Sequence, residues 1–362
     1  MLTRERILEA LKDVKDPELN RSLVDLNMIR DIHIKDDGTV MLTVVLTIAG
    51  CPLRNTIEKD IVNRLKGIGA KKISLTFGSM TDEERAELAK RLRQEAGQGK
   101  AKEGGALLSP LLAPDSKTRF IAITSGKGGV GKSTITVNLA VALARKGKKV
   151  GVIDADIYGF SIPDMMGIEQ RPTVIDEMIL PVEKHGVKVM SMGFFVTDNS
   201  PVIWRGPMLG RMLRNFFSEV YWGELDYMIL DLPPGTGDVA LDVHTLIPQC
   251  KEIIVTTPHA TAAFVAARAG TMAIKTKHEI LGVVENMAYY QLPDGSKDYI
   301  FGRGGGEKLA KVLKTELLAQ IPLGQADPQA TVDDPSPSIY AEDTPIGQIY
   351  AKLAERILEK TE

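Results

Sequence analysis

A glycine-rich stretch at residues 126–134 holds the side chains with the most definite chemistry in this sequence. It reads Gly126-Lys127-Gly128-Gly129-Val130-Gly131-Lys132-Ser133-Thr134 and fits the spacing G-x-x-x-x-G-K-[ST]. Its glycines allow successive backbone N–H groups to converge on phosphate oxygens. Lys132 can reach the β- and γ-phosphates, and the Ser133 hydroxyl can bind Mg²⁺. The stretch therefore predicts a nucleoside triphosphate site, with ATP and Mg²⁺ as its cofactors.

The segments on either side of this loop have the periodicity that such a site needs. Residues 120–124 form a short apolar run, which is typical of a buried strand. After the loop, Ile135, Leu139 and Leu143 recur at helical spacing. A strand, a glycine-rich loop and a helix in this order are the context that supports a phosphate-binding loop over a surface turn.

Carboxylates follow two further apolar runs. The run 149–153 is followed by Asp154 and Asp156, and the run 225–230 is followed by Asp231. In a parallel sheet, side chains at the carboxyl ends of strands lie where ligands bind. Asp231 is therefore predicted to hold Mg²⁺ through its second shell, while Asp154 or Asp156 binds Mg²⁺ through water or orients the attacking water.

Strand and helix patterns alternate from about residue 118 to residue 362, which favours an α/β fold with a parallel sheet covered on both faces. The segment 232–238 combines prolines and glycines after Asp231 and suits a loop that senses the γ-phosphate. Another strand pattern, 281–287, contains Asn286, whose side-chain amide can both donate to and accept from adenine.

Composition limits the class of protein. The 362 residues favour two domains, and the net charge of −2 argues against a general nucleic-acid partner. The chain has two cysteines, so no disulfide framework is implied. It contains no run of 18 apolar residues, so no membrane span is predicted. The first residues have no apolar core of a signal peptide, so we expect a cytoplasmic protein without a membrane partner. The five histidines are scattered, with no two at ligand spacing along the chain.

Three segments are predicted along the chain. Residues 1–80 show the order α-β-β-α-β and form a small α+β domain. Residues 81–117 start with a polar helix capped by Thr81 and continue as a glycine-rich linker. Residues 118–362 form the domain that carries the phosphate-binding loop.

The loop resembles the deviant Walker A motif of the ParA, MinD and nitrogenase iron-protein class of P-loop ATPases. The resemblance depends on Lys127, a second lysine in KGGVGKST that phosphate binding alone does not require. In that class this lysine crosses to the partner's nucleotide, so the resemblance implies a homodimer that encloses ATP. The resemblance also favours Asp156 over Asp154 as the acid near the γ-phosphate, and it assigns Asn286 to the adenine base.

The first domain resembles the MIP18-like domain of iron–sulfur assembly proteins. The likeness lies in V-x-D-P-E, V-D-L-x-M-I and T-x-x-G-C-P, which occur at residues 14–18, 24–29 and 47–52. That family's reactive cysteine corresponds to Cys51. A thiol beside a helix N-terminus is stabilised as thiolate, so Cys51 could be a ligand of an iron–sulfur cluster. A small buried apolar residue in a turn is the alternative interpretation.

The second domain resembles the Mrp/NBP35 branch of these ATPases, whose members carry iron–sulfur clusters to apoproteins. The likeness lies in W-R-G-P at 204–207, D-L-P-P-G-T-G-D at 231–238 and G-V-V-E-N-M at 282–287. The chain lacks the family's C-x-x-C after Asn286-Met287. Cys250 precedes a buried strand and is expected to be structural, which leaves Cys51 as the candidate thiol. The sequence thus predicts an ATP-hydrolysing cluster carrier, or alternatively an ATP-dependent switch that organises partner proteins without a cluster.

Overall fold

The computed structural model describes residues 2–48, 53–95, 109–113, 115–156, 159–195, 206–330 and 336–362. The chain divides into two compact units. Unit 1 contains residues 1–107, 172–181 and 219–221, and unit 2 contains residues 108–171, 182–218 and 222–362. Each unit is described by itself.

Unit 1 is built on a three-stranded sheet in the order β3-β4-β5, in which β3 and β4 are antiparallel and β4 and β5 are parallel. Its helices pack through apolar residues spaced four apart, such as Ile7 and Leu11 of α1 and Ile57 and Ile61 of α2. The α-β-β-α-β order expected from the sequence is present. The elements are α1 Arg4–Leu11, β1 Lys15–Asp16, β2 Arg21–Ser22, β3 Ile29–Ile34, β4 Thr39–Leu46, α2 Arg54–Gly67, β5 Lys72–Ser79 and α3 Asp82–Glu95.

A hairpin from far along the chain belongs to unit 1. It consists of β8 Thr173–Ile175 and β9 Met178–Leu180, which pair antiparallel. Its apolar side chains Ile175, Met178 and Leu180 are buried in the core of unit 1. The Thr173 hydroxyl donates to Glu18 Oε1 at 2.6 Å. The sequence analysis had assigned this segment to the domain that carries the phosphate-binding loop.

Unit 2 is organised around an eight-stranded sheet in the order β10-β11-β7-β12-β6-β13-β14-β17. Neighbouring strands are parallel except for the antiparallel pair of β10 and β11 at one edge. The four central strands are almost wholly buried and mostly apolar, as is typical of strands covered on both faces. The strands are β6 Arg119–Ser125, β7 Val150–Asp154, β10 Val182–Lys184, β11 Val187–Ser191, β12 Tyr227–Asp231, β13 Lys251–Thr256, β14 Ile280–Glu285 and β17 Leu317–Gln320.

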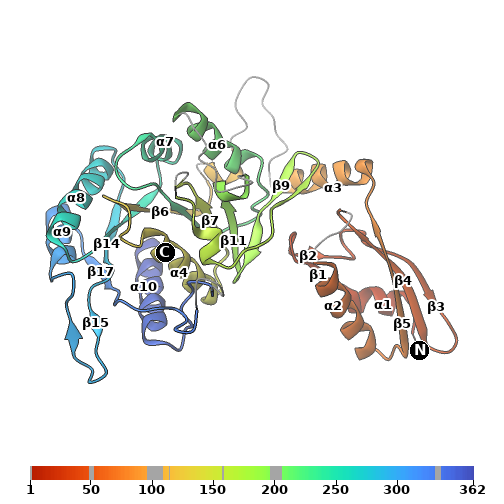
Figure 1. Ribbon diagram of the computed structural model, residues 1–362. Coiled ribbons are helices and arrows are strands. Elements are labelled where there is room, and N and C mark those ends of the chain that lie inside the picture. Colours follow the sequence, from red (N-terminus) through yellow and green to blue (C-terminus); the bar gives the residue numbers. More distant parts are fainter. Residues whose placement is uncertain are drawn as a thin grey trace. The chain divides into compact units, whose positions relative to one another are not determined.

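Helices cover both faces of this sheet, with α6 and α7 on one side and α4 and α10 on the other (Figure 1). The α/β fold with a mostly parallel sheet, predicted from the sequence, is confirmed. The remaining elements are η1 Pro110–Leu112, α4 Lys132–Arg145, α5 Ile162–Met165, η2 Met192–Phe195, α6 Gly206–Ser218, α7 Asp238–Leu246, α8 Ala260–Lys275, β15 Tyr290–Gln291, β16 Lys297–Asp298, α9 Gly305–Leu313 and α10 Pro345–Thr361.

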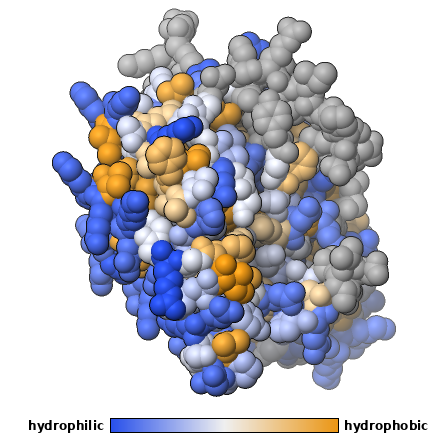
Figure 2. Space-filling model, turned by 60° about the vertical axis from the view of Figure 1, so that its left-hand side comes forward, coloured by the Kyte–Doolittle hydropathy of each residue, from blue (hydrophilic) through white to orange (hydrophobic). Residues whose placement is uncertain are grey.

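The surface of unit 2 carries some exposed apolar side chains. Figure 2 shows them on one face as small groups separated by hydrophilic residues. Among the large ones are Phe264 and Ile274 of α8 and Val312 of α9. In the described part of the chain, none of the helices combines the length and the apolar character needed to cross a membrane.

Candidate nucleotide-binding site

The glycine-rich loop joins β6 to α4, as the sequence predicted. Gly129 and Gly131 adopt φ values of +76° and +84°, a left-handed conformation that side chains with a Cβ rarely adopt. Gly131 is also the N-cap of α4, a 14-residue helix whose first residue is Lys132. The loop thus leads into a helix N-terminus, where unpaired N–H groups and the helix dipole favour a bound anion.

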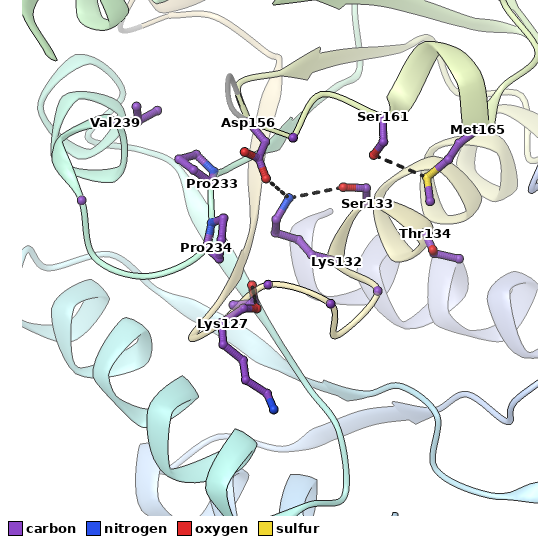
Figure 3. A pocket seen from close by; sticks show the side chains of 16 residues that line it. Lys127, Lys132, Ser133, Thr134, Asp156, Ser161, Met165, Pro233, Pro234 and Val239 are labelled. Carbon is purple, nitrogen blue, oxygen red and sulfur yellow. Dashed lines mark hydrogen bonds and ion pairs between the residues drawn. The ribbon is translucent and has the colours of Figure 1, made fainter. Parts of the chain in front are cut away.

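Lys132 points toward two carboxylates. Its side chain is only 6% exposed, and its ammonium nitrogen lies 2.8 Å from Asp231 Oδ2 and 3.6 Å from Asp156 Oδ2. Figure 3 shows the Lys132, Asp156 and Ser133 side chains converging on one point. Burial raises the pKa of Asp156, and the Lys132 ammonium acts in the opposite direction. Asp231 and Asp156 thus supply the negative partners that a buried amine needs.

Asp231 is the centre of the hydrogen bonds at the end of β12. Its carboxylate is fully buried and accepts a hydrogen bond of 2.6 Å from the Ser133 hydroxyl and another of 2.6 Å from the Thr136 hydroxyl. The sequence analysis did not select Thr136. Its place three residues after Ser133, on the same face of α4, was a usable signal. Two hydroxyls and a carboxylate offer the oxygen atoms that Mg²⁺ prefers.

Asp154 lies beside Asp231, because the two residues pair in register between the parallel strands β7 and β12. It is fully buried and does not line the cavity described below. Its carboxyl group interacts with the Ser191 hydroxyl at 2.9 Å and with the backbone N–H groups of Asp156 and Ile162 at 3.3 Å. Burial, and next the charge of Asp231, raise the pKa of Asp154 to about 8. Asp154 thus fixes the backbone at Asp156 and again at Ile162.

A cavity of about 680 Å³ opens beside the loop. Among the predicted site residues, it is lined by Lys127, Gly128, Gly129, Gly131, Lys132, Ser133, Thr134 and Asp156. Gly126, Val130, Asp154, Asp231 and Asn286 are not among the residues that line it. Gly237 also lines the cavity, and Pro233, Pro234 and Val239 lie on the side opposite Ser133 and Thr134 (Figure 3). The proline- and glycine-containing loop after β12 therefore faces the phosphate-binding loop, as a nucleotide-sensing loop must.

Two of the predicted site residues, Lys127 and Asn286, make no contact with Lys132 or the three acids in this conformation. The exposed Lys127 side chain points away from Lys132 (Figure 3). The buried Asn286 donates from Nδ2 to the Val130 carbonyl at 2.9 Å and so supports the loop from behind. A Cβ on Gly131 would lie 2.0 Å from the same Nδ2 atom. Contact with adenine by Asn286 stays a prediction.

Of the two cysteines, the structure describes Cys250 but not Cys51. Cys51 lies outside the described residues, so its role as a cluster ligand stays a prediction. Cys250 is buried, and burial raises the pKa of its thiol well above the ordinary value. The structural role expected for Cys250 agrees with this burial, since a buried thiol is inert.

The fold and these contacts define a P-loop nucleoside triphosphate-binding protein. Residues 116–358 match the family described as NUBPL iron-transfer P-loop NTPase, and residues 4–75 match the family described as iron-sulfur cluster assembly protein. The chain belongs to the NUBPL iron-transfer P-loop NTPase family. The resemblances stated from the sequence are thereby confirmed.

Known relatives cover nearly the whole chain. It is 53% identical to the "Iron-sulfur cluster carrier protein" of Bacillus subtilis, over 99% of this chain and 98% of the relative. It is 46% identical to a protein of the same name from Mycobacterium leprae, over 97% and 92% of the two chains. A solved nucleotide-binding protein from Archaeoglobus fulgidus, in complex with ADP, is 39% identical. That alignment covers 66% of this chain and 88% of the other, with a TM-score of 0.51.

Proposed function

We propose that this protein binds ATP with Mg²⁺, hydrolyses it to ADP and phosphate, and uses this cycle to carry iron–sulfur clusters to apoproteins. The observation that carries the proposal is the set of contacts made by Lys132, Ser133 and Asp231 where a glycine-rich loop enters a helix. A buried amine, a hydroxyl and a carboxylate at this place match the chemistry of a phosphate bound with Mg²⁺. The iron–sulfur cluster is proposed as cargo because the relatives are named iron–sulfur cluster carrier proteins.

Each side chain of the site has a proposed task. Lys132 leaves Asp231 to bind the β- and γ-phosphates, and the released Asp231 orients groups around Mg²⁺ together with Ser133. Bound Mg²⁺ would neutralise charge on the phosphates. Asp156 lines the cavity and is placed to orient the attacking water. The sequence predicted Asp154 near Mg²⁺. We propose instead that it acts without touching the metal, by fixing the backbone at Asp156 and Ile162 through hydrogen bonds.

The second lysine of the loop supports a homodimer proposal. Lys127 is exposed and directed away from its own Lys132, so it is free to serve a site on another chain (Figure 3). We propose that two chains face each other across two ATP molecules, with each Lys127 reaching the partner's nucleotide. Asn286 would then turn its amide from the Val130 carbonyl toward adenine as the nucleotide enters.

For the cargo, we propose that Cys51 supplies the working thiol. The chain has two cysteines, and the buried Cys250 is unsuited to bind a cluster. A dimer would therefore offer two Cys51 thiolates, and further ligands would have to complete the cluster. The expected partners are iron–sulfur apoproteins in the cytoplasm, and neither nucleic acid nor membrane is a proposed partner.

Anaerobic reconstitution with iron and sulfide tests this proposal. The wild type, Cys51→Ser and the matched control Cys250→Ser are compared with and without ATP, and iron and acid-labile sulfide are counted per chain. We expect a cluster in the wild type and in Cys250→Ser, and none in Cys51→Ser. If all three variants bind equal amounts, Cys51 is not the ligand. If none binds a cluster while ATP is still hydrolysed, the carrier proposal fails, and the ATP-dependent switch without a cluster becomes the better account.

A further inference from the structure

Unit 2 contains a second buried cluster of polar side chains, apart from the nucleotide cavity. His244 of α7 and Glu252 of β13 are both buried, and His244 Nε2 lies 2.6 Å from Glu252 Oε1. His278, also buried, stacks on His244 with ring centroids 4.3 Å apart. The sequence analysis treated these histidines as scattered, and the fold brings them together.

The hydrogen bonds of this cluster leave one proton between His244 and Glu252. The Thr276 hydroxyl lies 3.1 Å from His244 Nδ1 and 3.0 Å from His278 Nδ1, and it donates to the Met272 carbonyl at 2.9 Å. Since the single hydroxyl proton is used there, His244 Nδ1 donates to Thr276, while His278 Nε2 donates to the Ile247 carbonyl at 3.4 Å. The contact of His244 Nε2 with Glu252 is then made by one proton shared between imidazole and carboxyl. A carboxyl group buried in this way needs that partner.

A metal ion is the other ligand that two imidazoles and a carboxylate could hold, and their ligand atoms lie within 4.8 Å of one another. The ring geometry argues against it. The rings of His244 and His278 are stacked at an interplanar angle of 22°, and both turn Nδ1 toward Thr276. His244 Nε2 contacts Glu252, whereas His278 Nε2 donates to the Ile247 carbonyl at 3.4 Å, so the two Nε2 atoms serve different partners. The cluster is built as a hydrogen-bonded link.

This link joins α7 and β6, the two elements that adjoin the loops facing each other across the nucleotide cavity. His244 lies on α7, which begins directly after the cavity-lining loop that contains Pro233 and Pro234 (Figure 3). Glu252 extends the link to β6, because its Oε2 accepts a hydrogen bond from the Thr124 hydroxyl at 3.3 Å. Thr124 is followed by Ser125, the last residue of β6 before the glycine-rich loop. One buried chain of contacts thus runs from α7 to the strand that carries the loop.

We propose that His244 and Glu252 are positioning residues that set α7, and with it the loop at 233–237, relative to the phosphate-binding loop during ATP hydrolysis. The proposal rests on the proposed ATPase function. The link touches α7 and β6 and has no atom in the cavity lining, so its loss should disturb turnover more than nucleotide binding. Replacing a residue that is needed only for folding would instead lower turnover, nucleotide affinity and stability together.

Two substitutions separate the polar link from packing. His244→Phe keeps a flat ring in the buried space and removes both hydrogen bonds. Glu252→Gln is the conservative control, since its amide can donate to His244 Nε2 while its carbonyl accepts from Thr124. For each full-length variant we would measure kcat and KM for ATP hydrolysis, the Kd for ADP, and the melting temperature. Hydrogen exchange of residues 238–246 would be followed with and without ADP.

We expect His244→Phe to lower kcat about tenfold or more, with the Kd for ADP within about twofold of the wild type. Glu252→Gln should stay within about threefold in kcat. Exchange at 238–246 should slow on nucleotide binding in the wild type and lose this response in His244→Phe. Wild-type kcat in His244→Phe, or a parallel loss of ADP affinity and melting temperature, would overturn the link. If the wild type hydrolyses no ATP, the proposed function fails, and the exchange response alone then decides whether the link exists.

Discussion

Replacing Asp154 by asparagine should change how stability depends on pH. Asp154 is fully buried and lies in register with Asp231 on the neighbouring strand. Burial and the charge of Asp231 raise its pKa to about 8, whereas the pKa of an aspartate in an unfolded chain is about 3.9. Between these values the folded protein holds a proton that the unfolded chain has released. Stability contributed by this group is therefore fully present below about pH 4 and is lost as pH rises toward 8.

The size of the effect follows from proton linkage. One proton held only by the folded state gives a slope of about 1.4 kcal/mol per pH unit. An asparagine side chain does not titrate, so the free energy of unfolding of the wild type minus that of Asp154→Asn should fall by about 2 kcal/mol between about pH 5.5 and about pH 7.0. Taking this difference cancels the contribution of the other carboxyl groups with raised pKa values, Asp156 among them.

Urea unfolding at three pH values spread evenly over this range, in EDTA and without nucleotide, measures this difference. The fluorescence of Trp222, which is buried in unit 2, reports the transition. Asp298→Asn on β16 is the matched control, since it removes an exposed carboxylate, and its stability should run parallel to that of the wild type. If Asp154→Asn also ran parallel to the wild type, the raised pKa of Asp154 and the burial argument behind it would be refuted.

Three further predictions concern other contacts of unit 2. Gly131→Ala should weaken ADP binding at least about tenfold in a titration, because its Cβ would displace the Asn286 amide and its φ of +84° strains any side chain; unchanged affinity would contradict this. Thr136→Val removes a buried hydrogen bond to Asp231 and should lower the free energy of unfolding by about 1–3 kcal/mol, which Thr136→Ser should largely restore. Cys250 should react with a thiol reagent only after unfolding, whereas fast labelling of native Cys51→Ser would show that Cys250 is accessible.

Local patterns were sufficient to predict the phosphate-binding loop. The glycines, Lys132 and Ser133 are contiguous, and a strand before them and a helix after them suffice to place their backbone groups. The acids at the ends of β7 and β12 were also predictable, because apolar runs that end in aspartate indicate buried parallel strands. The family could be identified for the same reason, since its motifs are short and continuous.

The different surroundings of the three acids could not be predicted from the sequence. Asp231 binds Lys132 and Ser133 because the sheet places β12 directly beside β6, although Ser133 and Asp231 are 98 residues apart. Asp154 and Asp156 are two residues apart along the chain, yet one is fully buried and the other lines the cavity. Burial and neighbouring charge decide which acid can hold a proton, and both depend on strand order.

The sequence by itself determined that the chain has a nucleotide site and which loop forms it, because glycine conformation and helix initiation are properties of neighbouring residues. Only the tertiary structure decided what surrounds that loop. It buries apolar side chains of the β8–β9 hairpin in the core of unit 1. It also stacks the ring of His244, which lies on α7, on that of His278, which lies outside that helix. Such contacts arise from the packing of elements far apart in the chain, which local sequence patterns do not reveal.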